Sequence, residues 1–377
     1  MANKKISNIL FSLGAVFFLG YIIATVQQAH GYAGWLLMSF FLFIAIGFRF
    51  IPVLKGFFFT VMIFAAVSLA MYYPQYFIAV GSFKMSVLIV PLMQIIMFGM
   101  GTGLGIKDFA GVVKMPKGVI VGVLCHYMVM PPVAFLITRV FDFPPEIAAG
   151  IILIGSCPNG LASNVMSYLA RANLALSVTL TAISTLLAPL MTPLFMQWLA
   201  GEYVTISFWD MAWDITKIIL IPVAAGLIFN HFLHGRAKWL DSLMPVLSMA
   251  GIGLIIVVTT AAGRDDLLVV GPVLILAALF HNTSGYFLGY WLARLMRMDK
   301  RDSRTIAIEV GMQNAGMGSS LALAMGKLST VGLASAVFSP IMNITGSSLA
   351  LWWRARPLKE KTPVKEETPE SDKHIND

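Results

Sequence analysis

Among the acidic residues of this 377-residue chain, only Glu309 lies well inside an apolar run. A carboxylate at membrane depth is costly, so such a residue usually faces a cavity and a cation. Its surroundings, SRTIAIEVGMQNAGMGSSLAL (303–323), interrupt the apolar run with amides, glycines and hydroxyls. We expect Glu309 to bind a cation; the alternative is a structural acid satisfied by neighbouring hydroxyls.

A second apolar run is interrupted in the same way. The stretch GSCPNGLASNVMSYLAR (155–171) places Pro158, Asn159, Gly160, Ser163 and Asn164 between apolar segments. Backbone groups freed by a helix break cannot face lipid, so they must line a cavity or bind something. Freed carbonyls suit a small cation, and the N-termini of half-helices suit an anion. Two such breaks in corresponding halves of a chain indicate a transporter binding site.

The composition identifies the kind of protein that must position these groups. Hydrophobic residues make up 58% of the chain and charged residues 12%, against about 25% charged residues in soluble domains. We therefore predict an all-α polytopic membrane protein. Its apolar runs predict about twelve spans, near 8–28, 33–54, 57–73, 86–105, 117–138, 147–169, 174–199, 208–233, 243–262, 268–293, 304–326 and 330–353.

The positions of the basic residues predict the orientation. With the N-terminus in the cytoplasm, the outer segments hold only Lys84, Arg139, Arg264 and Lys327, as the positive-inside rule requires. Both termini are then cytoplasmic in the cell's inner (plasma) membrane, and residues 357–377 form a disordered tail. The net charge of +8 is a topology signal, so no nucleic-acid partner is expected and the lipid bilayer is.

The two broken spans are the sixth and the eleventh, so they cross the membrane in opposite senses. This arrangement is typical of an inverted repeat. We predict two five-helix repeats over spans 3–7 and 8–12, preceded by two additional spans.

Several stretches resemble the bile acid:sodium symporter family, in its bacterial form. CPNGLASNVMSYLARANLALSVTLTAISTLLAPLMTP (157–193) and EVGMQNAG (309–316) are similar to its two broken helices. IMFGMGTGL (96–104), HNTSGYFLGY (281–290) and NITGSSLA (343–350) are similar to further blocks, so the resemblance covers roughly residues 57–353.

The resemblance implies a core domain, with two crossing discontinuous helices, and a panel domain. The predicted regions are two additional N-terminal spans (1–56), panel helices (57–105 and 208–262), core helices (117–200 and 268–353) and the tail (357–377).

The resemblance also implies two sodium sites that share Glu309. The first would use Ser163, Asn164, Ser177, Thr181 and Glu309. The second would use His126, Glu309, Gln313 and the carbonyls of Val310 and Met312, with His126 in place of the family's common Gln. Because oxygen suits a hard ion better than nitrogen, this second site is expected to be weaker, pH-sensitive or partly replaced by a proton.

The substrate region departs further from the family. Its common GGT after the first Pro is Asn159, Gly160 and Leu161 here, and its His-Asn in the last helix is Met342 and Asn343. We expect Asn159, Gly160, Leu161, Asn314 and Asn343 to contact the substrate, whose identity these departures leave open.

These features predict a secondary active transporter, and not an enzyme. It would import an organic anion, such as a bile acid, a pantoate-like acid or a keto acid, by sodium symport with alternating access. Sodium is the coupling ion and no other cofactor is expected. The alternative is proton or mixed proton and sodium coupling through His126 and Glu309. An intramembrane enzyme is disfavoured because no Ser–His or His-Glu-x-x-His set lies at matching depth, and the paired breaks favour a transporter over a receptor or channel.

Overall fold

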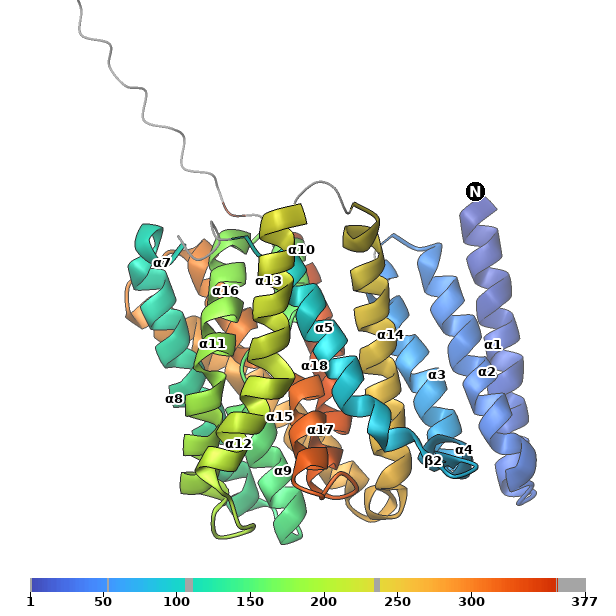
Figure 1. The fold of residues 1–377 in the computed structure, drawn as a ribbon. Coiled ribbons are helices and arrows are strands. Elements are labelled where there is room, and N and C mark those ends of the chain that lie inside the picture. Colours follow the sequence, from blue (N-terminus) through green and yellow to red (C-terminus); the bar gives the residue numbers. More distant parts are fainter. Residues whose placement is uncertain (1, 53, 106–110, 234–237, 357, 359–377) are drawn as a thin grey trace, which may run out of the picture.

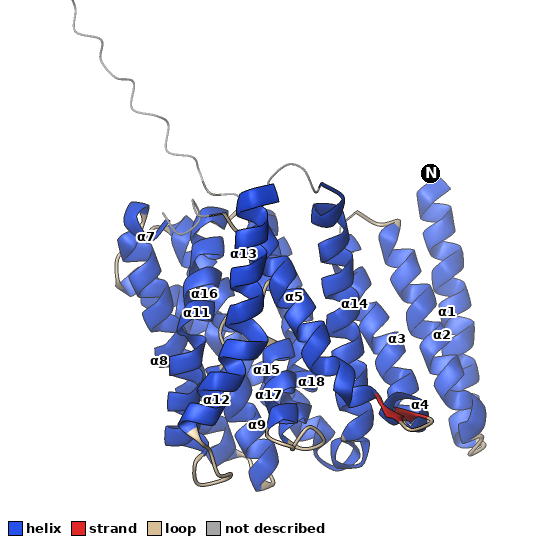
Figure 2. Cartoon of the chain, in the orientation of Figure 1, coloured by secondary structure: helices blue, strands red, loops and turns tan. Residues whose placement is uncertain are grey.

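The computed structural model describes all residues except 1, 53, 106–110, 234–237, 357 and 359–377. The predicted tail, 357–377, therefore lies outside the described residues apart from one position. The described chain is a bundle of helices, with one short hairpin of β1 (Ala79–Val80) and β2 (Phe83–Lys84) (Figure 2).

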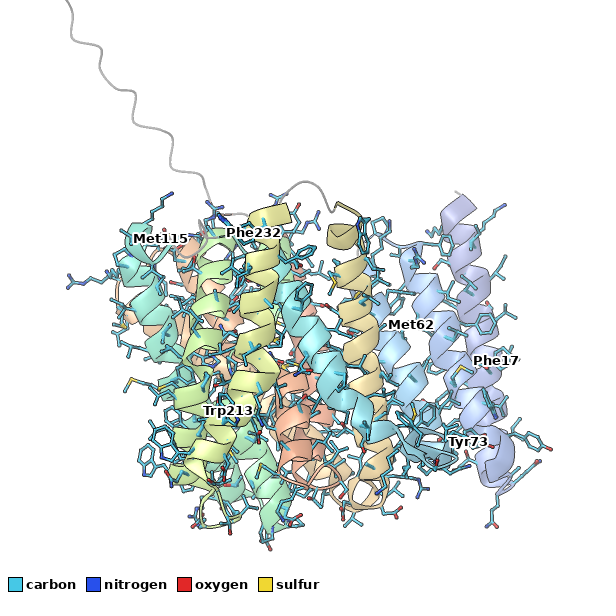
Figure 3. All side chains as sticks on the ribbon, in the orientation of Figure 1. Phe17, Met62, Tyr73, Met115, Trp213 and Phe232 are labelled. Atoms are coloured by element: carbon cyan, nitrogen blue, oxygen red, sulfur yellow. The ribbon has the colours of Figure 1, made fainter. Side chains whose placement is uncertain are left out.

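Nine helices of the described residues have the length and apolar composition to cross a membrane. They contain α1 (Ala2–Val26), α2 (His30–Arg49), α3 (Phe58–Tyr72), α5 (Ile89–Gly103), α8 (Pro116–Val140), α11 (Leu174–Phe195), α12 (Phe208–Ile215) with α13 (Ile221–Leu233), α14 (Lys238–Ala262) and α15 (Arg264–Leu295). The chain is thus an all-α multi-pass membrane protein. The outward-pointing Trp213 and Phe232, labelled in Figure 3, are 58% and 73% exposed, which suits a surface in contact with lipid.

Three further predicted spans have other forms. The span at 147–169 consists of α9 (Pro145–Ser156) and α10 (Ala162–Leu169), and that at 304–326 consists of α16 (Lys300–Gly311) and α17 (Ala315–Ala324). Both predicted helix breaks are therefore present in the fold. The last helix is α18 (Val331–Arg354). The total of about twelve crossings stays a prediction.

Short elements join these helices: the single-turn helices Lys55–Phe57 and Met85–Leu88, and the helices α4 (Gln75–Ile78) and α7 (Gly111–Lys114). Two π-helical turns were not predicted, Met196–Ala200 at the end of α11 and Thr216–Leu220 between α12 and α13. Such turns add a residue to a regular helix without changing its apolar pattern, so the sequence gives little sign of them.

The additional helices α1 and α2 lie at one side of the bundle (Figure 1). Helix α1 packs against α2, α2 against α3, and α3 against α14. The contact of α1 with α2 is close, because a Cβ on Gly47 would lie 2.5 Å from the Phe11 ring. These two helices therefore reach the rest of the bundle through α3.

Helix α5 packs against α13 and α14, next to the broken helices. A Cβ on Gly101 would lie 2.2 Å from the Val223 carbonyl oxygen, and a Cβ on Gly226 would lie 2.2 Å from the Phe98 carbonyl oxygen. Small residues thus bring the backbones of α5 and α13 together, as is common between membrane helices.

The broken helices are largely enclosed by other helices, except that Val165 and Tyr168 of α10 are exposed. Helix α9 packs against α8 and α18, α16 against α15 and α8, and α10 against α11 and α18. All residues from Ile147 to Ser156 and from Ser303 to Gly311 are buried. The packing isolates the two breaks from the lipid-facing surface.

Candidate ion and substrate site

The two helix breaks cross as a short antiparallel pair, Asn159 opposite Gln313. The Gly160 amide donates a hydrogen bond to the Met312 carbonyl at 3.0 Å, and the Asn314 amide donates one to the Pro158 carbonyl at 2.8 Å. Backbone groups released by each break are therefore partly satisfied by the other break.

Local sequence explains where each helix stops. Cys157 ends α9 in an extended conformation, as expected for a residue that precedes a proline. At Gly160 a Cβ would lie only 2.7 Å from the Gln313 carbonyl oxygen, so the crossing requires glycine here. In the second break, the Asn314 side chain accepts a hydrogen bond from the Met317 backbone amide at 3.0 Å and caps α17.

The Glu309 carboxylate lies beside this crossing and is 1% exposed. One oxygen accepts a hydrogen bond from the Ser177 hydroxyl. The other accepts from the Asn159 side-chain amide and, at 3.0 Å, from the Thr181 hydroxyl. Residues from α16, α11 and the first break thus meet at one carboxylate.

Two residues of α10 complete this cluster. The side-chain oxygen of Asn164 lies 2.8 Å from the Ser177 hydroxyl and 3.3 Å from the Thr181 hydroxyl. Each hydroxyl has one proton, so it can donate either to Asn164 or to Glu309. The buried hydroxyl of Ser163 donates to the Gly160 carbonyl at 2.8 Å, at the start of the same helix. The five residues predicted for the first sodium site therefore lie together.

This cluster has the chemistry of a site for a hard cation. It offers one carboxylate, one amide oxygen and several hydroxyls, which are the ligands that such ions prefer. None of the ion pairs between described residues involves Glu309. A buried carboxylate with only neutral donors lacks a counter-charge, which a bound sodium ion would supply.

The residues predicted for the second site lie at the crossing or next to it. His126 on α8 donates from Nε2 to the Cys157 carbonyl at 3.0 Å, since a carbonyl can only accept, and its Nδ1 has no hydrogen-bond partner. The side-chain amide nitrogen of Gln313 donates to the Val310 carbonyl at 2.7 Å. The side-chain oxygen of Gln313 has no hydrogen-bond partner. The Met312 carbonyl receives the bond from Gly160 described above.

A cavity of about 710 Å³ adjoins the crossing. Helices α3, α5 and α14 contribute one part of its wall, and the two breaks, α10 and α18 contribute another. No charged side chain is present among the described residues that line it. Methionines form much of its surface: Met93, Met97, Met100, Met166, Met244, Met249, Met312 and Met342.

Four of the five residues predicted to contact substrate line this cavity: Gly160, Leu161, Asn314 and Asn343. Asn159 is placed differently, because its side chain is 3% exposed and donates to Glu309. The antiparallel pairing of the breaks decides this placement, and no local sequence pattern reports it.

Sequence reasoning did not identify the residues that hold the end of α16. Asn282 on α15 donates from its side-chain amide to the Gly311 carbonyl and accepts from the Thr345 hydroxyl. The Tyr286 hydroxyl lies 3.3 Å from the Asn282 amide. The polar residues in HNTSGYFLGY (281–290) were the available signal, since polar side chains in a span usually have partners.

Several known proteins are similar to this chain over most of its length. Residues 90–269 match the profile of the Sodium Bile acid symporter family. The chain is 40% identical to the sodium-dependent transporter YocS of Bacillus subtilis (strain 168), over 81% of this chain and 92% of that protein. It is 37% identical to the probable sodium/metabolite cotransporter BASS1, chloroplastic, of Arabidopsis thaliana, over 71% of this chain and 67% of that protein.

It is also 32% identical to the human ileal sodium/bile acid cotransporter, over 64% of this chain and 72% of that protein. Its relatives are transporters and not enzymes. This chain belongs to the sodium bile acid symporter family.

Proposed function

We propose that this chain is a sodium-coupled symporter that imports an organic anion by alternating access. One observation carries the proposal: the buried Glu309 carboxylate is surrounded by neutral oxygen and amide groups and has no basic partner among the described residues. Such a carboxylate needs a cation, and the sodium-dependent relatives indicate which one.

The first sodium site would consist of Ser163, Asn164, Ser177, Thr181 and Glu309, and the second of His126, Glu309, Gln313 and the carbonyls of Val310 and Met312. In this proposal sodium neutralises Glu309 and orders the two breaks. Residues 117–200 and 268–353 form a core domain that moves against a panel domain, 57–105 and 208–262. The antiparallel pairing of Asn159 with Gln313 supports the inverted repeat that this motion requires.

The substrate would bind in the cavity between these domains. Its negative charge would meet the N-terminal ends of α10 and α17 and the amides of Asn314 and Asn343. Because no basic side chain lines the cavity among the residues that the structure describes, a single carboxylate is favoured over a dicarboxylate. The methionines and Leu161 would contact the apolar part, as in a bile acid, a pantoate-like acid or a branched keto acid.

The cavity also indicates which state of the cycle the structure represents. Gly56, Leu104, Asn230 and Met244 line it and lie near the predicted cytoplasmic ends of their spans. With both termini in the cytoplasm and the protein in the plasma membrane, the cavity belongs to an inward-facing state.

Uptake by proteoliposomes tests the proposal. A thermal-shift screen of organic acids, including bile acids and pantoate, in sodium and in choline first selects a radiolabelled substrate. Uptake is then measured under a sodium gradient, under a proton gradient without sodium, and with neither gradient. Uptake that requires the sodium gradient supports the proposal. Equal uptake in choline overturns it, and uptake that requires only the proton gradient supports the alternative through His126 and Glu309.

A further inference from the structure

Three buried polar atoms near the crossing have no hydrogen-bond partner: Asn159 Oδ1, Gln313 Oε1 and His126 Nδ1. The three residues are between 1% and 4% exposed. Two of the atoms are amide oxygens and the third is the lone-pair nitrogen of a neutral imidazole, because His126 uses its Nε2 hydrogen on Cys157. All three can only accept, so each of them lacks a donor or a cation.

The backbone brings these residues together. Asn159 and Gln313 are directly opposite in the antiparallel pair, and opposite residues in such a pair have neighbouring side chains. His126 bonds to the carbonyl of Cys157, two positions before Asn159. The unpartnered acceptors therefore belong to one small region beside Glu309.

Asn159 links this region to the carboxylate. Its amide nitrogen donates to Glu309, while its oxygen has no partner. A flip of the amide about its last torsion exchanges these two atoms. Without a cation, the oxygen would then meet a negative carboxylate, which is unfavourable. With a cation at Glu309, the oxygen becomes a ligand.

We propose that Asn159 is a sodium ligand, in addition to the residues of the proposed function on which this inference rests. In the ion-free state its amide donates to Glu309. When sodium binds, the amide turns, so that Oδ1 takes the place of the amide nitrogen beside Glu309 and becomes a ligand of the ion. Sodium is a hard cation that prefers oxygen to the nitrogen of His126, so an additional amide oxygen is chemically favoured here.

The test is sodium binding to the purified full-length protein. Sodium chloride is titrated against choline chloride at constant ionic strength, with isothermal calorimetry and the sodium-dependent rise in melting temperature as readouts. Asn159→Leu keeps the approximate shape of the side chain but removes both amide atoms. We expect its sodium affinity to fall by at least about tenfold, as for loss of a group from a metal site. Thr259→Val is the matched control, because it removes a buried hydrogen bond to the Ile255 carbonyl within α14, a helix that carries neither break.

An unchanged or higher sodium affinity in Asn159→Leu would overturn the inference, since an amide that only satisfies the empty carboxylate would compete with the ion. If Asn159→Leu does not fold, Asn159→Ala is used instead, and its sodium affinity is expected to fall in the same way. A wild-type protein that shows no sodium response would instead contradict the proposed function. The two failures are therefore distinguishable.

Discussion

Glu146 at the start of α9 forms an ion pair with Lys327, which lies in the connection between α17 and α18. The Thr330 hydroxyl donates to the same carboxylate at 2.5 Å. Behind this pair, a Cβ on Gly150 would lie 2.3 Å from the Val331 carbonyl oxygen, so α9 and α18 are in close contact. Glu146, Lys327 and Thr330 therefore connect the start of α9, which leads into the first break, to the segment after α17, which follows the second break.

This cluster predicts a pH dependence of stability. Hydrogen bonds from Lys327 and Thr330 hold the pKa of Glu146 below its ordinary value of 4.5. A carboxyl group with a lowered pKa stabilises the fold above pH 4.5, and this contribution is lost as the pH falls through its folded-state pKa. The Glu146 and Lys327 side chains are 37% and 35% exposed, so solvent screening limits the contribution to about 1 kcal/mol or less.

The measurement compares melting temperatures of the wild type and Glu146→Gln from neutral pH to about pH 3. The wild type should be more stable at neutral pH, and the difference should disappear at the acid end. A difference that stays constant with pH would show that the Glu146 charge is not its cause.

Removal of the Glu309 charge should affect stability in the opposite direction to removal of the Glu146 charge. Glu309→Gln removes an unpaired buried charge, so in sodium-free buffer its melting temperature should be equal to or above that of the wild type. The same variant should lose the rise in melting temperature that sodium produces. Glu202→Gln is the control, since Glu202 is exposed and pairs with Arg139. A sodium response that survives in Glu309→Gln would place the ion elsewhere.

Much of this arrangement could be predicted from local sequence. The two helix breaks were predicted by Pro158 and Gly160 in one run and by the Gly311–Asn314 region in the other. Residues that interrupt a helix act on the segment that contains them, so they can be recognised locally. The contacts of Glu309 with Ser177 and Asn159 join residues 132 and 150 positions apart. No periodicity encodes them, so the family resemblance indicated the sodium set, and the direction of the Asn159 side chain became evident only from the paired backbones.

Hydroxyl groups on α11 predict a graded loss of ion affinity. Ser177→Ala and Thr181→Val each remove an oxygen that contacts Glu309 and Asn164. Sodium affinity, measured by calorimetry, should fall by about tenfold in each variant. Thr181→Ser keeps the hydroxyl, so it should retain most of the wild-type affinity. Thr185→Val, one turn along the same helix, removes only a bond to the Thr181 carbonyl. An equal loss in Thr185→Val would indicate a general packing effect.

The crossing itself depends on Gly160. In Gly160→Ala the new Cβ would lie 2.7 Å from the Gln313 carbonyl oxygen, so the backbones must separate. We expect destabilisation of roughly 1–3 kcal/mol, as for other overpacked sites, seen as a lower melting temperature and a weaker sodium response. Gly103→Ala is the control, because no atom lies within 4 Å of its added Cβ. A fully stable Gly160→Ala protein would contradict the close crossing.

His126 predicts a gain in ion affinity when an oxygen replaces its ring nitrogen. In His126→Gln the new amide can donate to the Cys157 carbonyl, as Nε2 does now, and present an oxygen where Nδ1 has no partner. Since sodium prefers oxygen ligands, the sodium affinity should rise, by up to about tenfold. His281→Gln is a matched control: His281 is equally buried, bonds through Nε2 to the Met130 carbonyl at 3.1 Å, and also has an unpartnered Nδ1. A rise in both variants would reflect general loosening of the helices, whereas a rise only in His126→Gln would assign His126 to the ion site.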